Sequence, residues 1–138
     1  MTYLLDTHYL IWALADTKKL SKNIKEIIVN PDHKIVISTV SFWEISLKSY
    51  LGKLNIIGFL PEDLPEACLE VGFDIECLSA KACSTYHKLK GAYHKDPFDR
   101  MLIWQAIQND YTLISSDRNV IKYASEGLKV AGGQSLWY

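Results

Sequence analysis

The sequence predicts an α/β fold in which helices cover both faces of a parallel sheet. Segments with strand character and segments with helix character alternate along the 138 residues. The strand segments are short and apolar without clean alternation, which is typical of strands buried on both faces. Two of them end in an aspartate, Asp6 and Asp117. Because ligands bind at the carboxyl edge of such sheets, the same pattern also predicts where a site lies.

Short apolar runs are expected to form the sheet, and helical patterns occupy most of the chain between them. The expected strands cover residues 3–5, 34–38, 73–78, 112–115 and 128–131. The expected helices cover a segment with Leu10, Ile11 and Leu14, then residues 22–29, 39–51, 61–71, 80–89, 97–108 and 118–124. Asn30-Pro31-Asp32 ends the second helix, and Thr39 or Ser41 caps the third. Asp96 and Pro97 begin the sixth helix as its cap and first residue.

Length and composition limit the class of protein. A chain of 138 residues corresponds to one domain, so residues 1–138 are expected to form a single unit with a sizeable core. The formal charge is -1, so any nucleic-acid binding must be local. Three cysteines without a C-x-x-C pair indicate neither a disulfide framework nor a zinc site. No leader or membrane-spanning stretch is apparent, and a soluble cytoplasmic protein is expected.

Two further acids accompany Asp6 and Asp117: Glu44 on the third expected helix and Asp99 in the first turn of the sixth. Each acid has an ordinary structural explanation. Asp6 and Asp117 suit helix N-caps, and Glu44 suits a surface ion pair with Lys48. Capping explains each acid singly, but it does not explain the set. Four carboxylates in one pocket repel one another by about 4 kcal/mol per close pair, so the set indicates a divalent cation.

Each acid also lies in a characteristic fragment. The fragments are Leu4-Leu5-Asp6-Thr7-His8, Ser41-Phe42-Trp43-Glu44-Ile45-Ser46, Asp96-Pro97-Phe98-Asp99-Arg100-Met101-Leu102-Ile103 and Ile114-Ser115-Ser116-Asp117. In this order they resemble the acidic motifs of PIN-domain nucleases, and more closely those of VapC-type toxins of bacterial toxin–antitoxin pairs. The resemblance implies a three-layer α/β/α fold with a five-stranded parallel sheet. It also implies Mg²⁺ or Mn²⁺ as cofactor, endoribonuclease activity on RNA and a partner antitoxin.

The resemblance assigns a cluster of four acids with two hydroxyls beside it: Asp6, Glu44, Asp99 and Asp117, with Thr7 and Ser116. Oxygen donors without a Cys or His cluster suit Mg²⁺. Asp6 and Asp99 are expected to bind the ion directly, and Asp117 to bind it through water or to bind a second ion. Glu44 is expected to orient the attacking water or to complete the surroundings of the ion. The chemistry that follows is hydrolysis of a phosphodiester.

A basic rim beside the acids is expected to attract the phosphate backbone. Its candidate members are Lys48, Lys95, Arg100 and Arg118, with Asp96 as a further residue around the site. The alternative for each lysine is a solvated face. Tyr93 or His94 is a candidate for stacking on an unpaired base.

Two other enzyme classes and one non-enzyme function are alternatives for the same residues. A haloacid-dehalogenase-type phosphatase needs a second Asp two residues after Asp6, where His8 stands. A receiver domain needs an acceptor Asp after the third strand, where Leu78-Ser79-Ala80 stands. The non-enzyme alternative is a catalytically inactive PIN-fold module that binds protein or RNA.

Association of two copies is a further expectation. The chain has four tryptophans and eight tyrosines, and its first helices carry Tyr9, Trp12 and Leu14, which cannot all face the sheet. Aromatic residues left outside a core are enriched at interfaces. The alternative is that Trp12 packs inward and Tyr9 is a lone surface aromatic. The resemblance favours a homodimer and an antitoxin segment that covers the acidic site, and both are expected.

Overall fold

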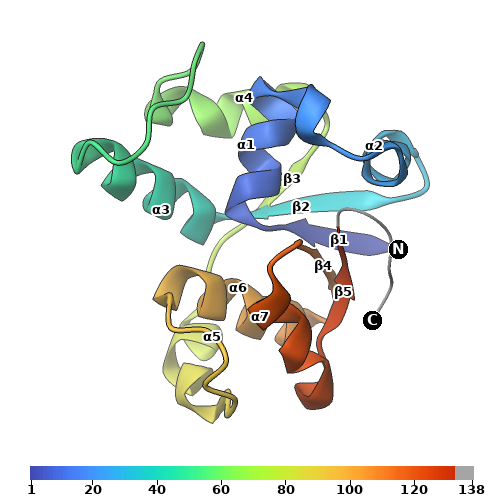
Figure 1. The fold of residues 1–138 in the computed structure, drawn as a ribbon, viewed down its shortest axis with the longest axis vertical. Helices are drawn as coiled ribbons and strands as arrows, with labels where there is room; N and C mark the ends of the chain where they lie inside the picture. The colour runs from blue at the N-terminus through green and yellow to red at the C-terminus, as the bar shows by residue number, and fades with distance from the viewer. Residues whose placement is uncertain (133–138) are drawn as a thin grey trace.

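The computed structural model describes residues 1–132, and a five-stranded sheet lies at its centre (Figure 1). The strands are β1 (Thr2–Leu5), β2 (Lys34–Ser38), β3 (Asp74–Glu76), β4 (Thr112–Ile114) and β5 (Lys129–Ala131). They lie in the order β3-β2-β1-β4-β5, and every neighbouring pair is parallel. The predicted parallel sheet is confirmed. The sequence predicts one domain over residues 1–138. Residues 133–138 lie outside the described part of the chain, so this boundary stays a prediction.

Helices occupy the expected segments, but three of these segments are divided. The α-helices are α1 (Thr7–Ala15), α2 (Lys22–Val29), α3 (Thr39–Tyr50), α4 (Leu64–Glu70), α5 (Ala80–Thr85), α6 (Pro97–Asn109) and α7 (Arg118–Ile121). The 3-10 helices are η1 (Thr17–Lys19), η2 (Pro61–Asp63), η3 (Tyr86–Lys88) and η4 (Lys122–Glu126). Each of the expected helices 61–71, 80–89 and 118–124 thus joins an α-helix to a 3-10 segment, a common form of helix end.

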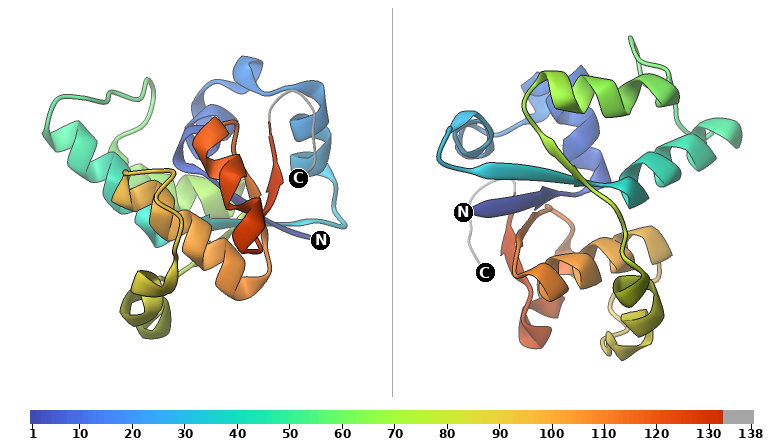
Figure 2. Two further views of the ribbon diagram at one scale, coloured as in Figure 1. Left: turned by 60° about the horizontal axis from the view of Figure 1, so that its bottom comes forward. Right: turned by 180° about the vertical axis from the view of Figure 1, so that it is seen from behind.

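The helices form two layers, one on each face of the sheet (Figures 1 and 2). Helices α1, α2 and α4 lie on one face, and α5, α6 and α7 lie on the other. Alternate residues of β1 separate the two cores: Tyr3 and Leu5 pack with the first group, while Leu4 packs with the second. This confirms the three-layer α/β/α architecture, and period-two alternation explains how one strand serves two cores.

The aromatic side chains of α1 are more buried than expected. Tyr9 is only 2% exposed and belongs to the core, and Trp12 and Leu14 are half-buried and pack against that core. The expectation that this stretch leaves aromatic side chains outside is therefore wrong for Tyr9. Two exposed aromatics lie instead on α3, where Trp43 is 63% and Tyr50 is 87% exposed, and Tyr93 before α6 is 44% exposed.

The register of the central strands positions the acids. Leu5 of β1 is paired with Ile114 of β4, and the backbone N–H of Asp6 donates to the carbonyl of Ile114 over 3.1 Å. Both strands therefore end at the same level of the sheet. Asp6 and Ser115, the residues that follow, are brought side by side at its carboxyl edge.

Candidate active site

Asp6 lies at the junction of β1 and α1, and it is buried. Its Oδ1 accepts a hydrogen bond of 2.8 Å from the backbone N–H of Tyr9, which makes it the N-cap of α1. Burial raises the pKa of Asp6 to about 6, even though hydrogen bonds from Tyr9 and Ser115 oppose the shift. Ionisation of this carboxyl in its buried position therefore costs free energy.

Asp99 lies in the first turn of α6, which is fixed by the cap at Asp96. The Asp96 carboxylate accepts from the N–H of Phe98 over 2.8 Å and from that of Asp99 over 3.4 Å. Burial raises the pKa of Asp99 to about 6, and the carboxylates of Asp96 and Glu44 add to the shift. Asp6 also contributes, so these acids lie close enough to repel one another.

Asp117 begins α7, and its two oxygens have different partners. Oδ1 accepts from the N–H of Asn119 over 2.8 Å, and Oδ2 lies 2.8 Å from Nε2 of His94. Burial alone would raise the pKa of Asp117, but the hydrogen bonds from Asn119 and His94 outweigh it and lower the pKa. His94, Asp99 and Asp117 each place a possible ligand atom within 4.8 Å of the other two.

Glu44 reaches the same region from α3, where it is 3% exposed. The hydroxyl of Thr7 donates to Oε1 of Glu44 over 2.6 Å, and Lys48 pairs with its Oε2. Burial lowers the pKa of Lys48, but the bond to Glu44 and the nearby acids outweigh that effect and raise it. Lys48 therefore stays protonated, and it compensates the charge of a buried carboxylate.

A cavity of about 280 Å³ opens between these elements. The residues that line it come from β1, α1, α6 and the end of β4: Asp6, His8, Trp12, Asp99, Ser116 and Asp117. Three of the four expected acids face one cavity, whereas Glu44 is not among its lining residues and acts on Asp6 and Asp99 electrostatically. Carboxylate oxygens around a cavity of this size suit a hard divalent cation.

The expected basic residues are found in different surroundings. Lys95 and Arg118 are exposed, next to Asp96 and Asp117 in the chain. The Arg100 guanidinium instead donates to the carbonyls of Leu89 and Gly91 and to two tyrosine hydroxyls. Because these donors are used inside the protein, we do not include Arg100 among the residues that contact phosphates of the substrate.

Comparison with known proteins identifies the family. The model of the family described as PIN domain matches residues 3–126. The chain belongs to the PIN-domain family. A protein named Ribonuclease VapC22, from Mycobacterium tuberculosis, is 24% identical over 123 residues, which are 86% of this chain and 89% of that relative.

Solved structures share the fold of this PIN domain. VapBC2 from Rickettsia felis, bound to a DNA fragment from the promoter, has a TM-score of 0.62 and 19% identity over 96% of this chain and 98% of that chain. DNA-bound VapBC from Salmonella typhimurium has a TM-score of 0.67 and 13% identity over the same shares, 96% and 98%. The resemblance drawn from the four acidic fragments is confirmed at the level of family and fold.

Two residues of this PIN domain site were not expected in the roles that they have. His94, a candidate for base stacking, contacts two acids through its ring nitrogen. Ser115 rather than Ser116 is the buried hydroxyl: it bonds to Asp6 and accepts from the N–H of Asp117 over 3.2 Å. A signal for Ser115 was present, because the residue that directly follows β4 is the neighbour of Asp6 across the sheet.

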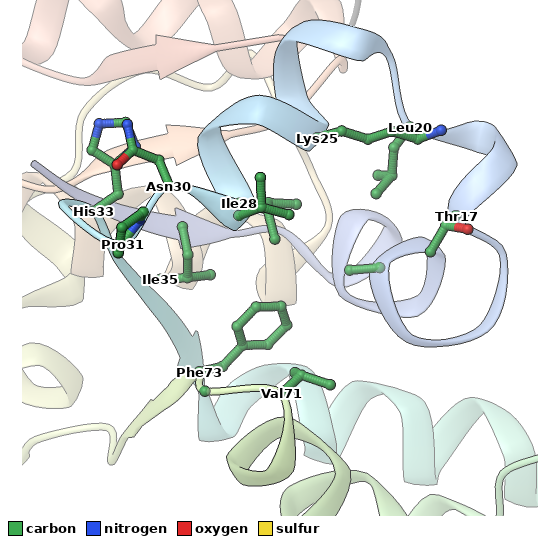
Figure 3. Close-up of a pocket in the computed structure, with 13 residues that line it drawn as sticks. Thr17, Leu20, Lys25, Ile28, Asn30, Pro31, His33, Ile35, Val71 and Phe73 are labelled. Atoms are coloured by element: carbon green, nitrogen blue, oxygen red, sulfur yellow. The ribbon is translucent and has the colours of Figure 1, made fainter.

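A larger cavity of about 650 Å³ lies away from the acids (Figure 3). Residues of α1 and α2 and of the segments before β2 and β3 line it, with Leu20, Ile28, Ile35 and Phe73 among its apolar side chains. No carboxylate belongs to its lining within residues 1–132. Among the described residues, the acidic cluster therefore lines the smaller cavity and not the larger one. Over the same described residues, no helix is both long and apolar enough to cross a membrane.

Proposed function

We propose that the chain is a metal-dependent endoribonuclease that hydrolyses RNA phosphodiester bonds in the cytoplasm as the toxin of a toxin–antitoxin pair. The observation that carries the proposal is the convergence of Asp6, Asp99 and Asp117 on one cavity at the carboxyl edge of the sheet. Family membership and the likeness to a protein named as a ribonuclease support the choice of RNA.

The donor set of the site fits Mg²⁺ or Mn²⁺. Asp6 and Asp99 would hold the ion, with Asp117 bound through water or to a second ion. The raised pKa values of Asp6 and Asp99 support this assignment, since a cation relieves the cost of ionising crowded carboxylates. When bound, such an ion polarises phosphate oxygens and lowers the pKa of its water.

The remaining residues orient and bind. Glu44 would complete the surroundings of the ion rather than contact the substrate, because Thr7 and Lys48 hold its buried carboxylate beside the cavity and it is not among the lining residues. Lys95 and Arg118, which are exposed beside the acids, would bind phosphates of the RNA. Ser116, an exposed hydroxyl in the cavity lining, is a further contact for substrate.

Cleavage of total cellular RNA with and without EDTA tests this function. Purified protein with Mg²⁺ or Mn²⁺ is expected to cleave RNA, and both EDTA and Asp99→Asn are expected to abolish cleavage. Cleavage that continues in EDTA would contradict metal dependence. RNA binding without cleavage under all conditions would favour the inactive binding module.

The proposal includes two partners. An antitoxin is expected to cover the acids, and its purified complex with this chain is expected to show no cleavage. A second copy is expected on the outer side of α3, where exposed Trp43 stacks edge-on against Phe98 at 5.1 Å between ring centroids. Beside them lies an apolar hollow of about 180 Å³, so this face offers both a protruding ring and a recess to a second copy.

A further inference from the structure

His94 joins acids that come from different elements of the fold. It lies in the segment between η3 and α6, and its Nε2 is 2.8 Å from Oδ2 of Asp117 and 3.2 Å from Oδ2 of Asp99. Its second ring nitrogen, Nδ1, lies 3.1 Å from the backbone nitrogen of Asp96. Both ring nitrogens are therefore used, and both face the beginning of α6 or the cavity beside it.

The contact at Nδ1 fixes the role of Nε2. The backbone N–H of Asp96 can only donate, so Nδ1 accepts, and the proton of a neutral ring must be on Nε2. Nε2 then donates to the carboxylate of Asp117, and it lies 3.2 Å from Oδ2 of Asp99. Binding of a metal by Nε2 would need a lone pair there, and the ring could supply it only by losing the bond from Asp96.

The segment that carries His94 is itself anchored. The hydroxyl of Tyr123 donates to the carbonyl of Gly91 over 2.7 Å and accepts from the N–H of His94 over 3.2 Å. Arg100 also donates to the carbonyl of Gly91, and the carboxylate of Glu126 accepts from the N–H of Gly91 over 2.7 Å. These contacts place the imidazole where it is, and they account for the inward position of Arg100.

We propose that His94 is a positioning residue of the acidic site, an inference that rests on the metal-dependent function proposed above. Nε2 is hydrogen-bonded to Asp117 and lies 3.2 Å from Asp99, and it thereby holds the two carboxylates next to each other, against their mutual repulsion, in the arrangement that receives a divalent cation. Each carboxylate oxygen has two lone pairs, so an oxygen that accepts from His94 still has one for a ligand. Partners of this kind orient metal ligands, and their loss costs about 10- to 100-fold in metal affinity.

Three substitutions separate this role from others. In His94→Gln the amide N–H reaches about as far as Nε2, so a donor to the acids is kept. In His94→Asn the amide reaches only as far as Nδ1, and in His94→Ala both contacts are lost. Mn²⁺ binding measured by calorimetry without RNA is expected to stay within about threefold of wild type in His94→Gln. It is expected to weaken by about 10- to 100-fold in the other two.

The matched control is His87→Ala, because His87 is an exposed histidine on the neighbouring η3 and should leave Mn²⁺ affinity unchanged. Unchanged or tighter binding in His94→Ala would overturn the inference, since the ring would then be dispensable or would compete with the ion. Equal losses in His94→Gln and His94→Ala would overturn it too, because the imidazole itself would be the ligand. If the alanine variant does not fold, the comparison of Gln with Asn decides.

The same measurements distinguish this inference from the proposed function. Wild-type protein that binds no Mn²⁺ would overturn both. Wild-type protein that binds Mn²⁺ and cleaves RNA, together with a His94→Ala variant of unchanged affinity, would overturn the role of His94 alone.

Discussion

Replacing Asp6 by asparagine should stabilise the protein at neutral pH while it removes a proposed metal ligand. Burial raises the pKa of Asp6 from 3.8 to about 6, so between these pH values the folded protein binds more protons than the unfolded chain. The free energy of unfolding therefore falls as the pH rises through this range. Asparagine carries no charge to desolvate, and it is as good an N-cap for α1 as aspartate.

The magnitude follows from the two pKa values. One pH unit of difference corresponds to about 1.4 kcal/mol, so the ionised Asp6 costs about 3 kcal/mol at pH 7.5. At pH 4.5 the folded protein keeps this carboxyl protonated, and the cost falls to about 1 kcal/mol. Asp6→Asn should therefore raise the free energy of unfolding by about 3 kcal/mol at the higher pH and by about 1 kcal/mol at the lower. The first value corresponds to a rise in Tm of about 10 °C.

Urea unfolding at both pH values, with EDTA present, measures the difference. Asp16→Asn is the matched control, because Asp16 lies next to the other end of α1 with a side chain that is 43% exposed, and its replacement should change stability by less than about 0.5 kcal/mol. A loss of stability in Asp6→Asn at pH 7.5 would refute the reasoning. So would a gain of the same size at both pH values, since the effect would then not come from ionisation.

Three further outcomes are expected. Millimolar Mg²⁺ should raise the Tm of the wild type and do so much less in Asp6→Asn, by linkage of binding to the folded state; a melting curve that no divalent ion shifts would contradict a preformed acidic site. Asp99→Asn should abolish RNA cleavage with the fold intact by circular dichroism, and near-normal cleavage would exclude Asp99 as a ligand. Trp43→Glu should turn a dimer into a monomer in light scattering, whereas a wild type that is already monomeric at high micromolar concentration would end the dimer proposal.

The positions of Asp6 and Asp117 were predictable from the sequence because they depend on local pattern and on one general property of parallel sheets. An apolar run that ends in an acid places that acid at the carboxyl edge, whatever the order of the strands. Asp99 followed in the same way from Asp96 and Pro97, which determine where α6 begins and hence which residues occupy its first turn.

The role of His94 was not predictable in this way. The segment that carries it has no periodic pattern, and its position depends on Tyr123 and Glu126, which lie about 30 residues further along the chain. The inward position of Arg100 was missed for the same reason: residues 87–100 have an excess of basic side chains, and only the folded chain brings carbonyls and tyrosine hydroxyls to the guanidinium. The burial of Tyr9 was not predicted because other parts of the core, besides the sheet, also cover helix α1.

One carboxylate can both cap a helix and bind another partner at the site, because it has two oxygens. Oδ1 of Asp117 caps α7 while Oδ2 bonds to His94, and Oδ1 of Asp6 caps α1 in a residue that also lines the cavity. The cap fixes the side chain before any ligand arrives, so little ordering remains to be done when a cation binds. Asparagine preserves the capping oxygen and removes the charge, whereas alanine removes both. Amide substitutions at Asp6 and Asp117 are therefore the ones that separate the helix start from the proposed metal site.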